Sequence, residues 1–178
     1  MIFIPGFLIA ILTFPGVIVH EAAHFLFCRL FRLAVFDVCY FRMGNPSGYV
    51  VHEETGSFRT AFFVGMGPFF VNTLLCLLFC LPAFIPVGEL DVIDPLAYFF
   101  YWLGISIGMH AFPSTHDLSN IWKLQGEAAK AFDPLAILSY PLVAVLYVAN
   151  FLRIIWADLG YGLAVGFLLP LGLFRWLA

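Results

Sequence analysis

Two histidines and a glutamate stand close together in the segment HEAAH at positions 20–24. On a helix, residues four positions apart lie on one face, so His20 and His24 can both reach a single metal ion. Zinc accepts imidazole nitrogen, and a catalytic zinc site uses three protein ligands and leaves one position for water. Glu21 can accept a proton from that water, which makes hydroxide available as a nucleophile. The segment therefore predicts a hydrolytic site with Zn²⁺ as cofactor and Glu21 as the catalytic base.

The chain that carries this segment is strongly apolar. Of its 178 residues, 63% are hydrophobic and 11% are charged, and its mean hydropathy is +1.00. A soluble domain carries roughly 25% charged residues. The composition excludes a soluble globular domain, an intrinsically disordered chain and nucleic-acid binding through a basic surface. We therefore expect one membrane-embedded domain over residues 1–178.

Long stretches with few charges predict about five transmembrane helices, because a helix needs about 20 apolar residues to cross the hydrocarbon core. We expect these helices at 3–30, 60–84, 95–113, 134–154 and 158–177. The segment 35–55 is rich in Val, Tyr and Phe around the turn cluster Gly-Asn-Pro-Ser-Gly, which favours a β-hairpin. The expected fold is an all-α polytopic membrane protein with a small β-hairpin after its first helix.

Lys and Arg are concentrated in the connections after the first and third expected helices. The connection after the second contains Glu89, Asp91 and Asp94 but no basic residue. The positive-inside rule then predicts an outside N-terminus, a cytosolic C-terminus and an HEAAH segment nearer the cytosolic side. The absence of a targeting sequence favours a prokaryotic plasma membrane.

A third metal ligand must come from elsewhere in the chain. The candidates in apolar surroundings are His110, His116 and Asp117, at the end of the third expected helix. Pro113 interrupts that helix, and irregular backbone at membrane depth is tolerated where it lines a site. Asp117 could instead cap the helix that follows, since a side-chain oxygen at a helix start accepts backbone N–H groups. The residues alone leave these alternatives open.

In type and order, these motifs resemble the site-2 protease family of intramembrane zinc metalloproteases, over about residues 5–125. HEAAH in a transmembrane helix is the most specific feature. The segment 67–72, Gly-Pro-Phe-Phe-Val-Asn, is similar to the Gly-Pro helix of that family. The segment 113–117, Pro-Ser-Thr-His-Asp, is similar to its proline-led segment that ends in an aspartate ligand.

The resemblance implies a zinc ion held by His20, His24 and Asp117, with Glu21 as general base. His110 or His116 is the alternative third ligand. The family usually has glycine after its aspartate, whereas this chain has leucine, and neither a PDZ nor a CBS domain is attached. The chain thus looks like a minimal, divergent member.

The resemblance also implies a set of residues that position the substrate beside the metal. The Gly-Pro helix of the family packs next to the active site, and an asparagine before its aspartate holds substrate. His110 stands in the corresponding neighbourhood here. The expected substrate-positioning residues are Asn72, His110, Gly67 and Pro68.

The expected activity is hydrolysis of a peptide bond in or next to a transmembrane segment. The expected partners are a transmembrane protein substrate and the lipid bilayer, with no nucleic acid and with homo-oligomer formation left open. The hairpin either offers an edge strand to an unwound substrate or is a structural element at the membrane surface. His52, Glu53 and Glu54 are candidates for the mouth of a water path. Two alternatives are a membrane zinc hydrolase acting on a non-peptide amide or lipid, and a non-catalytic metal-binding pseudoprotease or scaffold.

Overall fold

The computed structural model describes residues 6–177, and most of them are helical. The regular elements are α1 (Gly6–Leu12), α2 (Phe14–Leu30), β1 (Val35–Cys39), β2 (Tyr49–His52), α3 (Phe58–Phe84), α4 (Pro95–Met109), α5 (Thr115–Lys130), α6 (Pro134–Phe151), α7 (Ala157–Leu163) and α8 (Leu169–Leu177). A π-helical turn, Ile85–Glu89, continues α3, and a second one, Ala164–Leu168, joins α7 to α8. The predicted class, helical with one small hairpin, is confirmed.

Three helical segments of the described chain are long and apolar enough to cross a membrane. They are Phe58–Glu89, Pro134–Ile155 and Ala157–Trp176. They correspond to the second, fourth and fifth expected spans. The first expected span divides at Thr13 into α1 and α2, and its residues 3–5 lie outside the described part. The third is the 15-residue helix α4.

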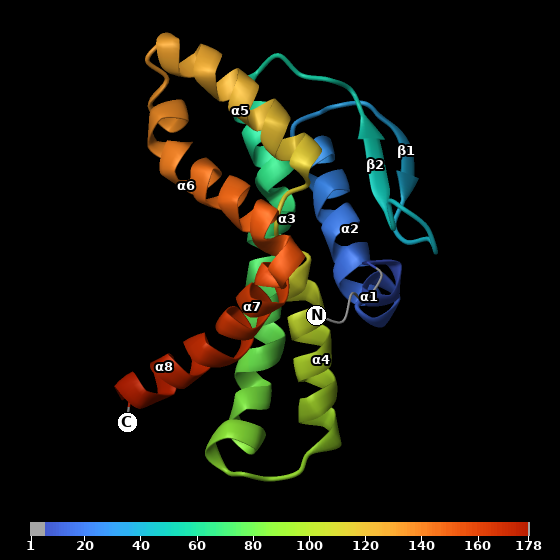
Figure 1. Ribbon diagram of the computed structural model, residues 1–178, viewed down its shortest axis with the longest axis vertical. Coiled ribbons are helices and arrows are strands. Elements are labelled where there is room, and N and C mark those ends of the chain that lie inside the picture. The colour runs from blue at the N-terminus through green and yellow to red at the C-terminus, as the bar shows by residue number, and fades with distance from the viewer. Residues whose placement is uncertain (1–5, 178) are drawn as a thin grey trace.

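Helix α3 runs along the long axis of the molecule, and the other elements lie on either side of it (Figure 1). One end, which we call the α5 end, contains the start of α3, the end of α2, the hairpin, and α5 with the start of α6. At the other end, which we call the α4 end, residues 90–94 connect α3 to α4. Helix α4 returns beside α3 and ends near the middle of the molecule, where the chain becomes irregular before α5.

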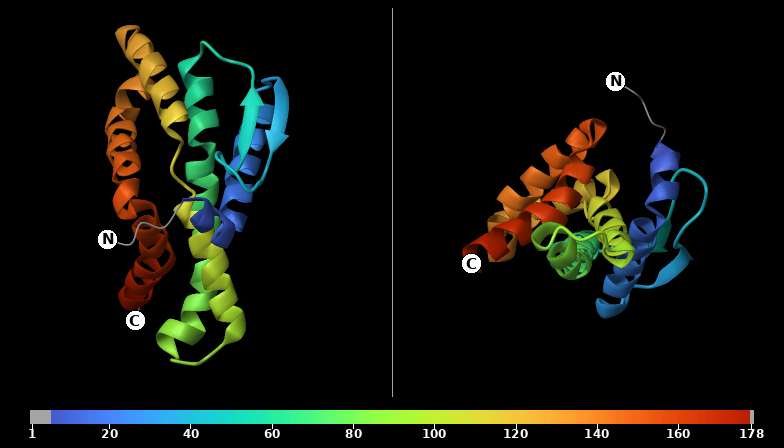
Figure 2. Two further views of the ribbon diagram at one scale, coloured as in Figure 1. Left: turned by 45° about the vertical axis from the view of Figure 1, so that its right-hand side comes forward. Right: turned by 90° about the horizontal axis from the view of Figure 1, so that it is seen from below.

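The C-terminus lies toward the α4 end, which corrects the predicted arrangement. Helices α6, α7 and α8 follow one another away from the α5 end in both side views (Figures 1 and 2). Two antiparallel spans would have returned the chain to the side of the basic connections. The break between them is a single 3-10 turn, Leu152–Ile155, followed by Trp156 at φ 66°. This turn bends the chain but does not reverse it, and hydropathy cannot distinguish a bend from a reversal.

The hairpin forms where the sequence predicts it. Strands β1 and β2 are antiparallel, with Val35 opposite His52 and Cys39 opposite Tyr49. Within the described residues the sheet has only these two strands, so β2 pairs along one edge and leaves its other edge free. The hairpin lies beside α2 (Figure 1), and both strands contact that helix.

Close helix contacts fix the position of α2 and α5. A Cβ on Gly16 of α2 would collide with the carbonyl oxygen of Ser106 in α4. A Cβ on Gly65 of α3 would lie 3.3 Å from the Cβ of Asp117 and 2.8 Å from the Cδ1 of Ile121. Small residues that allow close backbone approach are typical of helix packing in membranes. These two glycines bring the two helices that carry the candidate ligands against a common scaffold of α3 and α4.

Candidate metal centre

The ionisable residues of HEAAH lie on one side of α2. The rings of His20 and His24 have their centroids 4.9 Å apart and stand nearly perpendicular. Glu21 and His24 are buried, with 8% and 7% of their surface exposed. Burying such groups in apolar surroundings is costly unless they are paired, hydrogen-bonded or bound to a metal. Their partners therefore decide what the site can do.

A backbone carbonyl orients His20. Its Nδ1 lies 2.6 Å from the carbonyl oxygen of His110. Because a carbonyl can only accept, Nδ1 carries the ring proton, and Nε2 keeps the lone pair that a metal ligand needs. A second hydrogen bond that fixes the tautomer in this way is usual for metal-binding histidines. The backbone at the C-terminus of α4 thus leaves Nε2 of His20 available to a metal ion.

Asn72 holds that same carbonyl from the side of α3. Its Nδ2 donates to the His110 carbonyl at 3.1 Å, to the Ile107 carbonyl at 3.1 Å and weakly to the Gly16 carbonyl at 3.4 Å. Asn72 is fully buried, and its Oδ1 has no partner within the described chain. It reaches His20 only through the His110 carbonyl. The structure thus places this predicted substrate-positioning residue behind the candidate ligand His20.

Asp117 reaches α2 from the first turn of α5. Ser114 caps this helix and forms a capping box with Asp117, in which each side chain bonds the backbone N–H of the other. The carboxylate of Asp117 also faces His24, whose Nε2 lies 3.5 Å from the Asp117 Oδ2. Burial would raise the pKa of Asp117, but His24 and the Ser114 hydroxyl together hold that pKa below its ordinary value. The two roles weighed for Asp117, cap and ligand, are therefore compatible.

The separation of His24 and Asp117 fits two ligands of one metal ion. An N–H···O hydrogen bond measures roughly 2.7–3.2 Å, so 3.5 Å is long for one. Two ligand atoms at about 2.0–2.2 Å from a tetrahedral zinc stand about 3.4 Å apart. Among residues 6–177, however, no three His, Cys, Asp or Glu side chains form a complete metal-binding group. The fit therefore rests on this one pair and on the free Nε2 of His20.

The other predicted residues take different positions. The His110 ring Nε2 lies 2.8 Å from the hydroxyl of Thr13, while its carbonyl serves His20. His116 is exposed, and it lines the same cavity as Asp117. Gly67 packs against the ring of Phe27, and Pro68 is buried within α3. Neither Gly67 nor Pro68 lines a cavity at the site.

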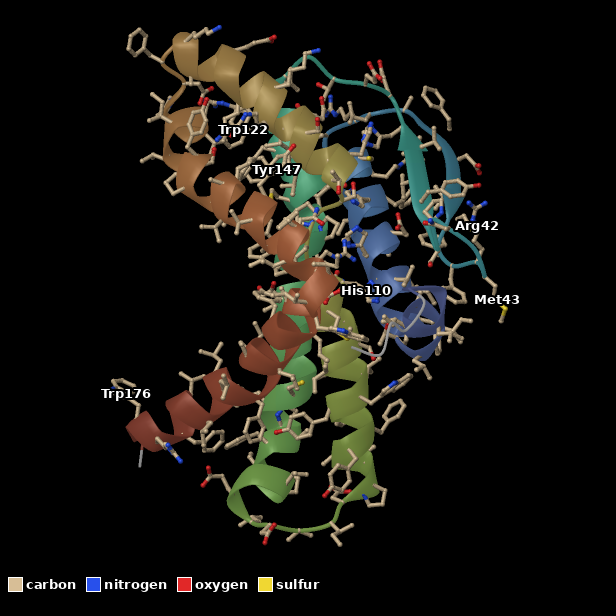
Figure 3. All side chains as sticks on the ribbon, viewed as in Figure 1. Arg42, Met43, His110, Trp122, Tyr147 and Trp176 are labelled. Carbon is tan, nitrogen blue, oxygen red and sulfur yellow. The ribbon has the colours of Figure 1, made fainter. Side chains whose placement is uncertain are left out.

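His20 and Glu21 line two adjoining cavities. The smaller, of about 310 Å³, is bounded by α2, the start of α5 and strand β2. It is lined by His20, Glu21, His24, Ser114, His116 and Asp117, together with Pro46, Gly48, Tyr49, Val50 and His52 of the hairpin. The larger, of about 750 Å³, shares His20 and Glu21 and extends past His110 to the α6–α7 junction. Figure 3 shows His110 near the middle of the molecule, beside that junction.

The hairpin turn covers Glu21. A Cβ on Gly48 would lie 2.7 Å from the Cγ and 3.0 Å from the Oε1 of Glu21. Sequence reasoning missed Gly48, although it recognised the turn that contains it. It also missed Ser114, which the capping-box spacing Ser-x-x-Asp could have revealed, and Arg153, a charged residue between two apolar stretches.

The sequence matches no family model and no curated protein, and the fold matches no solved structure.

Proposed function

We propose that this protein is a membrane-embedded zinc peptidase that hydrolyses a peptide bond in or next to a transmembrane segment. The observation that carries the proposal is the convergence of His20, Glu21 and His24 from α2 with Asp117 from α5 on one cavity. The 3.5 Å separation of His24 Nε2 and Asp117 Oδ2 supports a shared metal ion. Two imidazoles and one carboxylate are a donor set that catalytic zinc sites use.

The metal would be held by His20, His24 and Asp117. When bound, zinc would supply Lewis-acid activation of water and of the scissile carbonyl. Glu21, which shares the cavity with all three ligands, takes a proton from the attacking water and transfers it to the leaving amine. Ser114 holds the Asp117 carboxylate, and the His110 carbonyl holds the His20 ring, so both ligands are pre-oriented.

Strand β2 favours a peptide over a lipid or a small amide as substrate. Its residues Tyr49, Val50 and His52 line the smaller cavity, and no other strand of residues 6–177 pairs with its edge away from β1. A helical substrate hides its carbonyls in internal hydrogen bonds, so it must unwind before attack. An unwound segment can add to a free strand edge through main-chain hydrogen bonds. Such pairing would hold the peptide extended beside Glu21.

The apolar helices favour a substrate in the bilayer. Three helices of the described chain are able to span a membrane by length and composition. Large apolar side chains are exposed on α6, including Leu138, Val148 and Phe151. A substrate that shares the bilayer can approach the cavity without leaving apolar surroundings.

The proposal is tested with full-length protein purified in detergent, by metal analysis and by cleavage of synthetic transmembrane peptides. We expect about one zinc per chain and defined peptide fragments. Glu21→Gln should lower cleavage by about 10²- to 10⁴-fold while the zinc content is unchanged. Asp117→Asn should lower zinc binding and cleavage together. His116→Gln is the matched control, because it alters the neighbouring cavity residue and should leave zinc content unchanged.

Each alternative gives a different result in this experiment. Zinc without peptide fragments, but with release of product from a lipid or small amide, would identify a different hydrolase. Zinc with a Glu21→Gln variant that behaves like the wild type would identify a scaffold. Protein that remains free of zinc after incubation with the metal would contradict the proposal.

A further inference from the structure

Arg153 is a charged residue at an unusual place in the chain. It lies in the 3-10 turn between α6 and α7, with an apolar helical segment on each side. This junction is near the middle of the molecule, away from both ends of α3 (Figure 1). A charged side chain at such a depth is costly and marks a functional site by default. The peptidase chemistry described above does not use it.

The guanidinium of Arg153 has unused hydrogen-bonding capacity. Its Nε lies 3.6 Å from Oδ2 of Asp158, which is an ion-pair distance and too long for a good hydrogen bond. No hydrogen bond within residues 6–177 uses its guanidinium nitrogens. The Oδ1 of Asp158 already accepts from the Leu159 backbone N–H at 2.9 Å. The contact through Nε leaves the two terminal amino groups of Arg153 free, and these form the fork that recognises a carboxylate.

Arg153 shares a cavity with the catalytic base. The larger cavity is lined by His20 and Glu21, by Arg153 and Asp158, and by Met109, His110 and Phe112 among others. The Arg153 side chain is 39% exposed, whereas that of Asp158 is 17% exposed. A group bound in this cavity can therefore reach the guanidinium more readily than the carboxylate. The free capacity and the exposure both point to an anionic group as the ligand of this cavity.

We propose that Arg153 binds a carboxylate of the substrate and thereby selects peptides that carry one near the scissile bond. The inference rests on the proposed peptidase function, because it names a feature of the substrate of that same site. The carboxylate belongs either to an Asp or Glu side chain or to a free C-terminus. Both present the same planar pair of oxygens to the arginine fork.

Two sets of fluorescent apolar peptides in detergent micelles test the proposal, with the Glu21→Gln protein so that binding is measured without turnover. In one set, each peptide has a single Glu, or Gln in its neutral match, and the position of that residue differs from peptide to peptide. In the other, the peptide ends in a free carboxylate or a carboxamide. We expect at least one acidic peptide to bind about 10- to 100-fold more tightly than its neutral match, as a charged hydrogen-bonded pair allows. The set that shows the preference identifies the source of the carboxylate.

Second substitutions in the Glu21→Gln protein assign the preference to Arg153. Arg153→Gln should abolish it, and Arg153→Lys should keep only part of it, because lysine has the charge but not the fork. Asp158→Asn is the matched control and should keep the preference, since it leaves the guanidinium in place. Thermal melting of each variant shows whether it is folded.

Several results would overturn the carboxylate site. One is equal binding of every acidic peptide and its neutral match by the Glu21→Gln protein that keeps Arg153. A preference that survives in folded Arg153→Gln protein, or tighter binding of peptides with Lys, would do so as well. Preferred binding of acidic peptides that the wild-type protein never cleaves would contradict the peptidase function instead. Cleavage without any acidic preference would contradict the carboxylate site alone.

Discussion

The two ends of the molecule use the same helix α3 in different ways. Toward the α5 end, α3 packs against helices that bury ionisable residues, and irregular backbone and hairpin turns complete the site. Toward the α4 end, α3 packs against α4, and α4 packs against α7. Small residues line these contacts: Cys76, Cys80, Gly104, Gly108 and Gly162. The contrast suggests a test: if the α5 end carries the proposed chemistry, the α4 end acts as its support.

Overpacking the apolar end should have the largest effect on stability and little effect on the chemistry. In Gly104→Val, the new side chain would collide with the sulfur of Cys80 and approach the Cys76 carbonyl, a contact that is 3.1 Å for the Cβ alone. We expect a loss of about 1–3 kcal/mol in the free energy of unfolding, measured by thermal and denaturant unfolding in detergent. Cleavage per folded molecule should stay unchanged.

Gly172→Ala, in α8, is the control for this change, because a Cβ there meets nothing within 4 Å. It should be neutral or slightly stabilising, as alanine is the better helix former. If Gly104→Val instead lowered cleavage of the folded protein as strongly as Glu21→Gln does, the α4 end would not be a support alone.

Asn72 connects the two ends, and its substitution should weaken metal binding. Asn72→Ala removes a donor to the His110 carbonyl, so the group that orients His20 is held less firmly. Loss of such an outer partner typically costs about 10- to 100-fold in metal affinity. Zinc affinity is measured by competition with a chelator. Asn72→Asp should weaken zinc binding further, because its carboxylate cannot donate to the three carbonyls that Asn72 contacts.

Thr73→Ala is the matched control for Asn72, since Thr73 lies one residue further along α3. Its hydroxyl lies 2.7 Å from that of Tyr161, away from His20. It should change stability without changing zinc affinity. Equal losses of zinc affinity in Thr73→Ala and Asn72→Ala would show that α3 acts through general packing.

The smallest effect is expected at the surface of the α5 end, where Arg59 of α3 donates to Asp133 at the start of α6. This hydrogen bond holds the pKa of Asp133 below its ordinary value of 3.8. The stabilisation is therefore complete above pH 3.8 and is lost as the pH falls through the lower, folded-state pKa. Asp133→Asn keeps a helix cap but removes the charge. The difference in melting temperature between wild type and variant should be small near pH 7 and vanish in acid.

Much of the site could be predicted from the sequence, and the reason is local. The i, i+4 spacing of His20 and His24 fixes a shared helix face whatever the rest of the chain does. The turn cluster at 44–48 and the break at Pro113 are likewise encoded in residues that cannot continue a regular element. These signals predicted the helix that carries the candidate ligands, the hairpin and the irregular segment before α5.

The parts that could not be predicted depend on backbone groups and on long-range geometry. The partner of His20 is the carbonyl of His110, and every residue has a carbonyl, so no residue type reveals it. The sequence marked His110 by its imidazole, whereas its backbone carbonyl contacts His20 and its ring contacts Thr13. The path of the chain after Trp156 depends on one left-handed residue, which hydropathy does not detect.

The length of α3 has a consequence for the bilayer. With its π-helical continuation it spans 32 residues, which corresponds to about 48 Å at 1.5 Å per residue. The hydrocarbon core is about 30 Å thick, and transmembrane helices tilt by at most about 40°. For α3 in a bilayer, tilting alone would not absorb this difference, so part of the helix would protrude or the membrane would thicken around it. Hydrophobic mismatch of this kind should make the activity depend on acyl-chain length in vesicles of defined lipid.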